Sequence, residues 1–568
     1  PGRTFAVAWG CTHPPRHCGR GHPGAAGCQG TVASRRGGKN RPRRSECRRR
    51  SETCVLGSSP GSADILATRL AQLDAEIVIA EAERDDREIV AAQTKRRCAK
   101  QPTGERADRA GEQQRPIIIG FGPCGILAAL VLAQMGLKPI VVERGQDVRK
   151  RTQQTWGFWR KRKLNTESNV QFGEGGAGTF SDGKLWSQVK DRRHLGRKVL
   201  NEFVIAGAPE EILVESRPHI GTFKLVGMVE NMRAEIVRLG GEIRFEQKVE
   251  GVLRETSPDG HGQITGIKLN TGEILHSRHI VLAIGHSARD TFEMLLDHGV
   301  YIEAKPFSIG FRIEHPQSAI DRARFGDQAG HPALGAAEYK LVHHCKNGRS
   351  VYSFCMCPGG TVVAATSEEG RVVTNGMSQY SRNERNANAA IVVGISPEED
   401  FPGHPLAGID LQRQLESLAY QLGGENYNAP AQLVGDFLRN RPSTELASVI
   451  PSYQPGVTLG DLSKALPAFA IDAIREAIPQ FDKQVKGYAM ADAIMTGVET
   501  RTSAPVSIKR NEFYQSVNTK GLYPAGEGAG YAGGILSAGI DGIKVAEALA
   551  LDLLKQPLAP SLKRPLEQ

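Results

Sequence analysis

Net charge is nearly absent from most of this 568-residue chain. The formal net charge is +10, but residues 1–50 contain twelve Lys or Arg and a single acid, Glu46, which accounts for +11. The rest of the chain therefore carries a net charge of −1. A nearly neutral body lacks the strong positive field that nucleic-acid binding requires. We therefore expect a small-molecule substrate and no nucleic-acid partner.

Cysteine is too sparse for a disulfide framework, with ten in the whole chain. Six of them lie before residue 99, and their spacings match no zinc-site pattern: Cys11, Cys18, Cys28, Cys47, Cys54 and Cys98. The other four, Cys124, Cys345, Cys355 and Cys357, fit a reduced cytoplasmic enzyme. His343 and His344 are adjacent to Cys345, but neighbouring residues on a strand point to opposite faces. We therefore expect no metal site.

Long apolar runs are also scarce. The 21 residues from Ile117 to Leu137 carry no charge, which is long enough to span a bilayer. Six consecutive residues in their first half, Gly120-Phe-Gly-Pro-Cys-Gly125, would break a helix there, so a strand, a turn and a buried helix are expected instead. No signal peptide and no internal repeat are evident. These features favour a cytoplasmic protein without a membrane span.

The glycine motif at Gly120–Gly125 lies between an expected strand at Pro116–Gly120 and an expected helix at Pro123–Met135. A second strand is expected at Lys138–Glu143, which completes a βαβ unit. In such a unit the three glycines allow a tight turn, close approach of a pyrophosphate and close packing of the helix. The helix N-terminus then faces the phosphates, and Glu143 is placed to bind a ribose hydroxyl.

Three further glycine-rich segments follow this motif. Residues 173–184 contain successive glycines that could hold a pyrophosphate or the edge of a bound ring. Residues 280–290 form a buried strand that ends at Gly285, and residues 521–541 place Glu527 between a strand end and a helix. Four such segments in this order indicate one dinucleotide site.

In these segments the chain resembles flavoproteins of the glutathione-reductase-like superfamily, and more narrowly a family of bacterial FAD-dependent dehydrogenases. The narrower resemblance is carried by Gly120–Gly125, Asn169–Leu185, Gly310–Pro316, Ser353–Gly360 and Gly526–Gly534, and it covers about residues 115–555. It implies an α/β fold in which a Rossmann-like, three-layer ββα FAD-binding domain carries an inserted α+β substrate or cap domain.

The resemblance also implies the domain order and the residues that would bind FAD. We expect a disordered basic tail (1–60), a poorly defined region and linker (61–114), an FAD-binding domain in two parts (115–300 and 491–556), a substrate or cap domain (301–490) and a tail (557–568). Within residues 61–114, a short helix at Asp64–Leu73 and a strand at Ala75–Ala80 fit the pattern. The expected FAD contacts are Gly120, Gly122, Pro123, Cys124, Gly125, Glu143, Arg144, Gly176, Gly178, Thr179, Ser181, Asp182, Val249, Ala283, Gly285, Gly526, Glu527, Gly534 and Ile535.

Two sequence features of the disulfide-reductase branch of that superfamily are missing. There is no second Gly-x-Gly-x-x-Gly after a strand, so NAD(P)H, if it is used, is expected to bind transiently. There is also no Cys-x4-Cys redox motif. The late acid is Glu527, where the wider superfamily usually has Asp.

Cys355 and Cys357 are the candidate catalytic residues. Two residues apart on a strand, they would share one face, and a bridge between them would be strained and oxidising. The alternative is a buried pair of small apolar side chains. Four histidines are candidate proton shuttles or simply structural: His286, His315, His343 and His344. Arg501 and Thr502 could face the flavin or an anionic substrate.

We expect an FAD-dependent oxidoreductase that transfers hydride between an organic substrate and flavin N5. Two alternatives share the fold: a tRNA-modifying flavoenzyme, and a flavin-based sensor or assembly protein without turnover. The near-neutral charge of residues 51–568 disfavours the first alternative.

Overall fold

The computed structural model describes residues 115–258, 261–558 and 562–563. The expectations for residues 1–60 and 61–114, including the helix at Asp64–Leu73 and the strand at Ala75–Ala80, lie outside the described residues. So does most of the expected tail at 557–568.

The predicted βαβ unit is confirmed. Strand β1 (Ile117–Ile119), helix α2 (Pro123–Gln134) and strand β2 (Ile140–Val142) follow one another, and β1 and β2 pair in parallel. They belong to a five-stranded parallel sheet of order β19-β7-β1-β2-β3. Its remaining strands are β3 (Glu242–Arg244), β7 (Ile280–Leu282) and β19 (Leu522–Pro524). Because the five strands are parallel, their carboxyl ends lie at one edge of the sheet. The glycine-rich segments begin at that edge.

Both faces of this sheet are buried, and the side chains alternate between two cores. Ile118, Val141 and Val281 pack in the core that contains helices α2, α5 (Thr222–Arg238) and α11 (Ile535–Leu553). Ile117, Val142 and Ile280 pack instead in the core that contains the small antiparallel sheet. That sheet consists of β4 (Val249–Thr256), β5 (Gly262–Leu269), β6 (Ile274–His276) and β18 (Thr519–Lys520).

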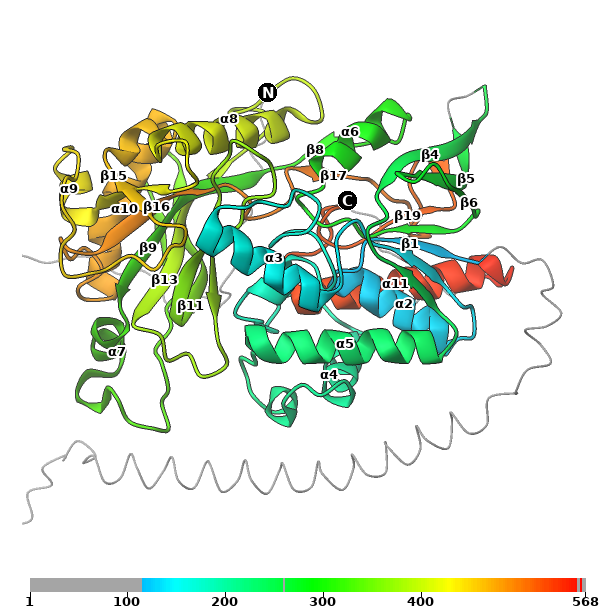
Figure 1. The fold of residues 1–568 in the computed structure, drawn as a ribbon, viewed down its shortest axis with the longest axis horizontal. Helices are drawn as coiled ribbons and strands as arrows, with labels where there is room; N and C mark the ends of the chain where they lie inside the picture. The colour runs from blue at the N-terminus through cyan, green and yellow to red at the C-terminus, as the bar shows by residue number, and fades with distance from the viewer. Residues whose placement is uncertain (1–114, 259–260, 559–561, 564–568) are drawn as a thin grey trace, which may run out of the picture. The chain divides into compact units, whose positions relative to one another are not determined.

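The result is three layers, with the helices on one side of the parallel sheet and the antiparallel sheet on the other (Figure 1). A strand that is covered on both faces needs apolar residues at every position, which explains the runs Ile117-Ile-Ile119 and Ile280-Val-Leu282. The fold class expected from the sequence, an α/β protein with a Rossmann-like ββα domain, is confirmed.

An eight-stranded sheet makes up most of the remaining chain, in the order β10-β11-β13-β9-β16-β14-β15, with β12 paired to β11. Its strands are β9 (Phe307–Pro316), β10 (Val342–His344), β11 (Ser350–Ala364), β12 (Thr374–Ser378), β13 (Asn386–Ile395), β14 (Ala429–Leu433), β15 (Val457–Leu459) and β16 (Ile494–Glu499). Helices α8 (Ala407–Leu422) and α10 (Ala468–Gln484) pack against it.

Strand β16 corrects one expected domain boundary. The boundary at residue 490 places this strand in the second part of the FAD-binding domain. In the structure β16 pairs with β9 and β14, with Met495 opposite Ile313. The antiparallel hydrogen bonds tie it to the eight-stranded sheet, so the return to the parallel sheet comes after Glu499.

Three helices around the parallel sheet were not predicted from the sequence: α3 (Val148–Lys161), α4 (Leu195–Ile205) and α6 (Arg289–Asp297). In α3 the Asp147 carboxylate caps the N-terminus by accepting from the N–H groups of Arg149 and Lys150. The expected strand, turn and helix at Ile117–Leu137 are confirmed. Within the described residues, no helix combines the length and the apolar character that crossing a membrane requires.

Helices α2 and α11 approach closely because glycine stands at position 542. A Cβ added there would lie 2.3 Å from the carbonyl oxygen of Cys124, so Gly542→Ala forces the two backbones apart. We expect a loss of about 1–3 kcal/mol in the free energy of unfolding, measured by urea denaturation. The matched control is Gly157→Ala in α3, where an added Cβ meets nothing within 4 Å. Alanine there should stabilise by about 0.5–1 kcal/mol, and equal midpoints for the two variants would contradict the close approach.

Candidate active site

A cavity of about 370 Å³ opens at the carboxyl ends of β1, β2 and β7. This edge of a parallel sheet is where nucleotides bind in such folds. Its wall includes Gly120–Cys124, Glu143 and residues 283–288, which follow β7. On the opposite side the wall is formed by Phe354 and Cys355 of β11, with Asn375 of β12. The cavity thus lies between the parallel sheet and the eight-stranded sheet.

The turn between β1 and α2 depends on its glycines. Gly120 has φ +97°, and a Cβ there would lie 2.4 Å from the carbonyl oxygen of Ala283. A Cβ on Gly125 would lie 2.0 Å from the carbonyl oxygen of Gly120. No side chain caps the N-terminus of α2, which begins at the cavity wall. Uncapped N–H groups with the helix dipole behind them suit an anionic group such as a pyrophosphate.

Glu143 directly follows β2 and is almost fully buried, with 5% of its surface exposed. Its Oε2 accepts the N–H of Phe121 at 2.8 Å, and its Oε1 accepts the N–H groups of Gly145 and Gly173 at 2.9 Å each. A carboxylate has about four acceptor positions, so this residue keeps capacity for a hydroxyl donor from the cavity. Glu143 therefore fits the expected ribose contact and also joins three loops.

The loop at 173–184 folds over Gly120–Gly125, the turn between β1 and α2, which we call the phosphate turn. Gly176 has φ +62°, and a Cβ there would lie 2.9 Å from the Cα of Gly122. Ser181 faces the cavity, but its Oγ donates to the carbonyl oxygen of Gly178 at 2.6 Å. Asp182 is buried and paired with Arg382 at 2.5 Å. The loop is therefore held by its own contacts before any ligand binds.

Most of the expected FAD contacts meet at this cavity. Its wall includes Gly120, Gly122, Pro123, Cys124, Glu143, Arg144, Gly176, Gly178, Ser181, Asp182, Val249, Ala283, Gly285, Glu527, Gly534 and Ile535. Gly125, Thr179 and Gly526 are not part of the wall. Gly125 lies beneath the turn, and the N–H of Gly526 donates to Asp541 at 2.8 Å. Thr179 belongs to the 173–184 loop, but it is outside the cavity wall and its Oγ1 lies 3.5 Å from an Arg151 nitrogen. This position does not support a direct contact between Thr179 and a bound phosphate.

Two of the expected contacts are held by charged partners. Arg144 is bonded to Glu167 at 2.8 Å and to Asp290 at 2.8 and 2.9 Å, and its guanidinium stacks over Phe172. Glu527 faces the cavity, and burial raises its pKa to about 7, although Lys305 opposes the shift. Glu527 can therefore exchange a proton near neutral pH.

Buried ion pairs support the wall that faces the phosphate turn. Arg312 of β9 bonds both carboxylate oxygens of Glu499, at 3.1 and 3.2 Å, and donates to the carbonyl oxygen of Cys355 at 2.9 Å. Arg501 bonds Glu416 at 2.9 and 3.1 Å, and Arg289 shares the same carboxylate. Glu416 thus fixes the position of the Arg501 guanidinium but shares its single negative charge between two cations.

The expected strand geometry at Cys355 and Cys357 is wrong. The pairing of β11 with β13 shifts register between Phe354 and Cys357, and Cys355 has φ +45°. A bulge breaks the alternation that would place residues two apart on one face. Only Cys355 faces the cavity, whereas Cys357 is fully buried. The two thiols still lie within hydrogen-bonding range of each other.

Of the four candidate histidines, only His286 lines the cavity. His315 is fully buried outside the cavity wall and its Nε2 lies 2.8 Å from the carbonyl oxygen of Tyr488, which favours the structural alternative for it. His343 and His344 point to different partners, as expected for neighbours on a strand: His343 contacts Glu476 at 3.1 Å, and His344 contacts Ser350 at 2.8 Å.

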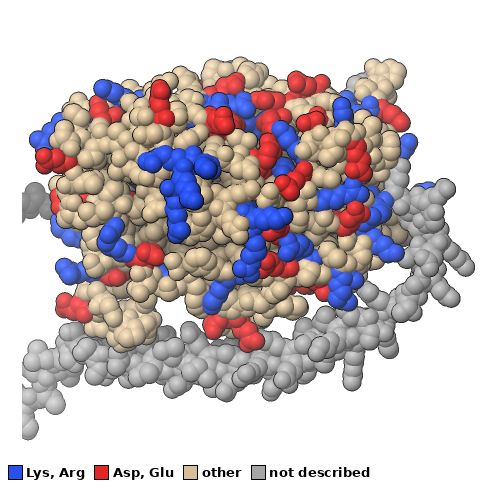
Figure 2. All heavy atoms as spheres, viewed as in Figure 1, with Lys and Arg blue, Asp and Glu red and all other residues tan. Residues whose placement is uncertain are grey.

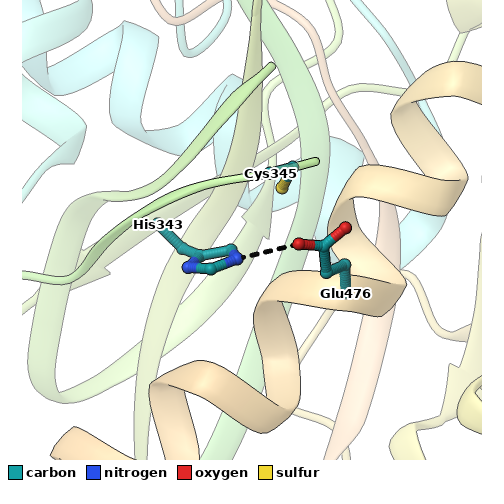
Figure 3. Close-up of side chains that lie close together, drawn as sticks. All are labelled: His343, Cys345 and Glu476. Atoms are coloured by element: carbon teal, nitrogen blue, oxygen red, sulfur yellow. Dashed lines mark hydrogen bonds and ion pairs between the residues drawn. The ribbon is translucent and has the colours of Figure 1, made fainter. Parts of the chain in front are cut away.

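His343, Cys345 and Glu476 nevertheless bring three potential metal ligands together (Figure 3). Their ligand atoms lie within 4.8 Å of one another, because Glu476 reaches over from α10. The Glu476 carboxylate already accepts the Lys346 N–H at 3.2 and 3.3 Å, and the Cys345 thiol donates to Ala473 at 3.5 Å. Protein groups thus satisfy the cluster, and the absence of a metal site stays a prediction.

Sequence reasoning missed several residues of the cavity wall: Gln171, Phe172, Lys184, Trp186, Gln247, Phe354, Asn375 and Glu499. Trp186, Gln247, Asn375 and Glu499 are ordinary polar or aromatic residues outside any motif. The other four lie within the segments Asn169–Leu185 (Gln171, Phe172 and Lys184) and Ser353–Gly360 (Phe354). Their place in recognised segments was the only available signal.

The parallel sheet, the glycine turn and the cavity define a dinucleotide-binding α/β protein. Residues 306–502 match a family described as "FAD-dependent protein, C-terminal domain-like". An uncharacterized protein of Clostridium beijerinckii is 55% identical over 434 residues, which cover 76% of this chain and 80% of the clostridial protein. The chain belongs to this family of FAD-dependent proteins.

Solved structures show more distant similarity. CtdE in complex with FAD is 13% identical, covering 78% of this chain and 91% of its own, with a TM-score of 0.30. The L-amino acid deaminase of Proteus vulgaris is 13% identical, covering 79% and 96%, with a TM-score of 0.35. A flavoprotein/dehydrogenase of Cytophaga hutchinsonii is 12% identical, covering 79% and 80%, with a TM-score of 0.32. Similarity at this level identifies neither a reaction nor a substrate.

The position of His286 leads to a prediction about pH. Burial and then the positive charges of Arg501 and Arg289 lower the pKa of His286 from 6.5 to about 3. The unfolded chain then binds a proton below about pH 6.5 that the folded protein does not, so acid destabilises the fold. Between pH 7 and pH 5 we expect the wild type to lose about 1–2 kcal/mol more stability than His286→Gln, measured by urea denaturation. Identical losses in the two proteins would show that His286 is protonated in the folded state.

Proposed function

We propose that this protein is an FAD-dependent oxidoreductase that transfers hydride between a small organic substrate and flavin N5. The observation that carries the proposal is the composition of one cavity wall. Gly122 and the N-terminus of α2 form an anion site on one side, and Phe354, Cys355 and Asn375 stand on the other. A cofactor bound at the first side would present its far end to the second.

The residues present fit FAD. Gly122 and the α2 N-terminus would hold the pyrophosphate, Glu143 the ribose, and the backbone around Val249 the adenine side. Gly534 and the uncapped N-terminus of α11 would face the other end of the molecule, where a partial positive charge stabilises a reduced flavin. When bound, FAD would supply the hydride chemistry of the reaction.

At the end of the cavity where the flavin ring would lie, side chains of the protein would supply a proton and charged groups. Glu527 is part of the cavity wall and interacts electrostatically with Lys305, which is outside the wall; burial lowers the pKa of Lys305 and raises that of Glu527. His286 stays neutral at pH 7 and can accept a hydrogen bond, with Ser287 Oγ 2.8 Å from its Nδ1. These groups can hold or move one proton without a net charge entering the cavity.

The partner proposed is a small molecule, with NAD(P)H as a transient electron donor. The cavity volume of about 370 Å³ is in the range of small-molecule sites, roughly 300–1,000 Å³. On the face that Figure 2 shows, Lys and Arg side chains lie among Asp and Glu side chains. That mixture supports the proposal over a tRNA-modifying enzyme, which needs a continuous basic face. A cytoplasmic location remains part of the same proposal.

Gly122→Ala tests whether FAD lies at the glycine turn. A Cβ there would contact the Cα of Gly176 at 3.6 Å, an ordinary distance, so the fold should tolerate it. The methyl group would occupy the gap through which the backbone approaches the pyrophosphate. We expect the Kd for FAD to rise about tenfold, or about 1.4 kcal/mol, in a flavin-fluorescence titration of the apoprotein.

Gly227→Ala in α5 is the matched control for this measurement. An added Cβ there meets nothing within 4 Å, and the residue is outside the cavity wall. Its Kd for FAD should equal that of the wild type. A Gly122→Ala protein with unchanged affinity would place the cofactor elsewhere.

Anaerobic reduction of the FAD-loaded protein tests the proposed reaction class. Purified protein is mixed with NADH, NADPH and a metabolite library, and loss of the oxidised flavin absorbance is followed by stopped flow. We expect at least one donor to reduce the flavin within the range of ordinary turnover, about 1–1,000 s⁻¹. Slow reduction by every donor, together with a stable protein partner, would favour the sensor alternative.

A further inference from the structure

Cys355 and Cys357 lie beside the reacting end of the cavity. Cys355 is part of the cavity wall, and Cys357 lies directly behind it with no exposed surface. The Cys357 thiol donates to the carbonyl oxygen of Cys355 at 3.4 Å, which places the Cys357 sulfur against the residue that faces the cavity. One sulfur is therefore accessible from the cavity and a second is within reach of the first.

The backbone at this pair is bent and held in place. A bulge interrupts β11 between Phe354 and Cys357, and Cys355 has φ +45°, which is unfavourable for a residue with a side chain. Arg312 stabilises the bend by donating to the carbonyl oxygen of Cys355 at 2.9 Å. Arg312 is itself oriented by Glu499 and by Asn388, whose Oδ1 accepts from it at 2.9 Å. A strained conformation that needs this support commonly serves a function.

Charges around the pair make the two thiols unequal. Proximity to Cys357, followed by the positive charges of Lys184 and Arg312, lowers the pKa of Cys355 below its usual value. Proximity to Cys355 and burial raise the pKa of Cys357. The acids that also face the pair are engaged, Asp182 with Arg382 and Glu499 with Arg312. The surroundings therefore favour a thiolate on Cys355 and a thiol on Cys357, the reactive form of a dithiol.

We propose that Cys355 and Cys357 are a redox-active dithiol that exchanges two electrons with the cofactor, an inference that rests on the proposed function. The Cys355 thiolate and the Cys357 thiol lose two electrons as the S–S bond forms and the S–H bond of Cys357 breaks. The oxidised isoalloxazine is the acceptor of both electrons and of that proton. Charge and atoms balance, because two electrons and one proton, a net charge of −1, pass from the cysteine pair to the flavin. The reverse reaction restores the dithiol.

The first experiment needs no FAD. The full-length apoprotein is treated with hydroxyethyl disulfide, denatured, alkylated and mapped by mass spectrometry. We expect Cys355 and Cys357 to resist alkylation as a bridged pair, while the buried Cys124 and Cys345 are alkylated. Cys357→Ser should instead trap hydroxyethanethiol on Cys355. Full alkylation of both residues after oxidation would overturn the proposal.

The second experiment counts electrons in the FAD-loaded protein. After oxidation, anaerobic titration with dithionite should require about four electrons per flavin in the wild type and about two in Cys357→Ser, since each couple takes two electrons. Cys345→Ser is the matched control, because Cys345 is buried outside the cavity wall, and it should also take about four. Equal thermal unfolding midpoints of the three proteins would show that the substitutions leave the fold intact.

The outcomes separate the two proposals. A protein that binds FAD and takes up two electrons in both the wild type and Cys357→Ser overturns the dithiol and leaves the proposed function standing. A protein that fails to bind FAD overturns the proposed function, and with it the electron exchange. A long-wavelength absorbance band of bound flavin that is present at neutral pH, fades on acidification and is lost in Cys355→Ser would support a thiolate against the flavin.

Discussion

The carboxylate of Glu143 accepts backbone N–H bonds from Phe121, Gly145 and Gly173, which belong to three separate segments. Hydrogen bonds to a charged group contribute about 1.5–3 kcal/mol each, more than ordinary ones. They draw the segments so close that a Cβ on Gly145 would lie 2.5 Å from the Cα of Gly173. The phosphate turn, the end of β2 and the glycine-rich loop therefore take up their positions together, and the cavity depends on that arrangement.

Buried charge organises the opposite wall in a comparable way. Arg312 and Glu499 are both buried, and each would be costly there without the other. Glu416 similarly serves Arg289 and Arg501 at once. Because each ion has a defined partner, the side chains that line this wall have few alternative positions. These ion pairs therefore hold the wall of the cavity formed by the eight-stranded sheet.

The two sheets contribute different parts of the site. The parallel sheet ends in glycine turns and helix N-termini, which recognise phosphate groups by backbone N–H bonds. The eight-stranded sheet contributes side chains, among them Phe354, Cys355 and Glu499. Backbone recognition suits a cofactor that every member of a class shares, whereas side chains can change with the substrate. The family match over residues 306–502 coincides with this second, side-chain half.

The sequence by itself determined the local features of the nucleotide half. Gly120, Gly122 and Gly125, the apolar runs of β1 and β7, and the helix that starts after Gly534 all follow from residue type and spacing, because φ/ψ preference and two-sided burial are local properties. Only the tertiary structure decided the rest. The bulge at Cys355, the reach of Glu476 to His343, the partners of Arg501 and the pairing of β16 depend on contacts between residues far apart in the chain. Hydrogen bonds and charges formed at such distances leave no periodic pattern in the sequence, so their geometry emerges only when the two sheets pack.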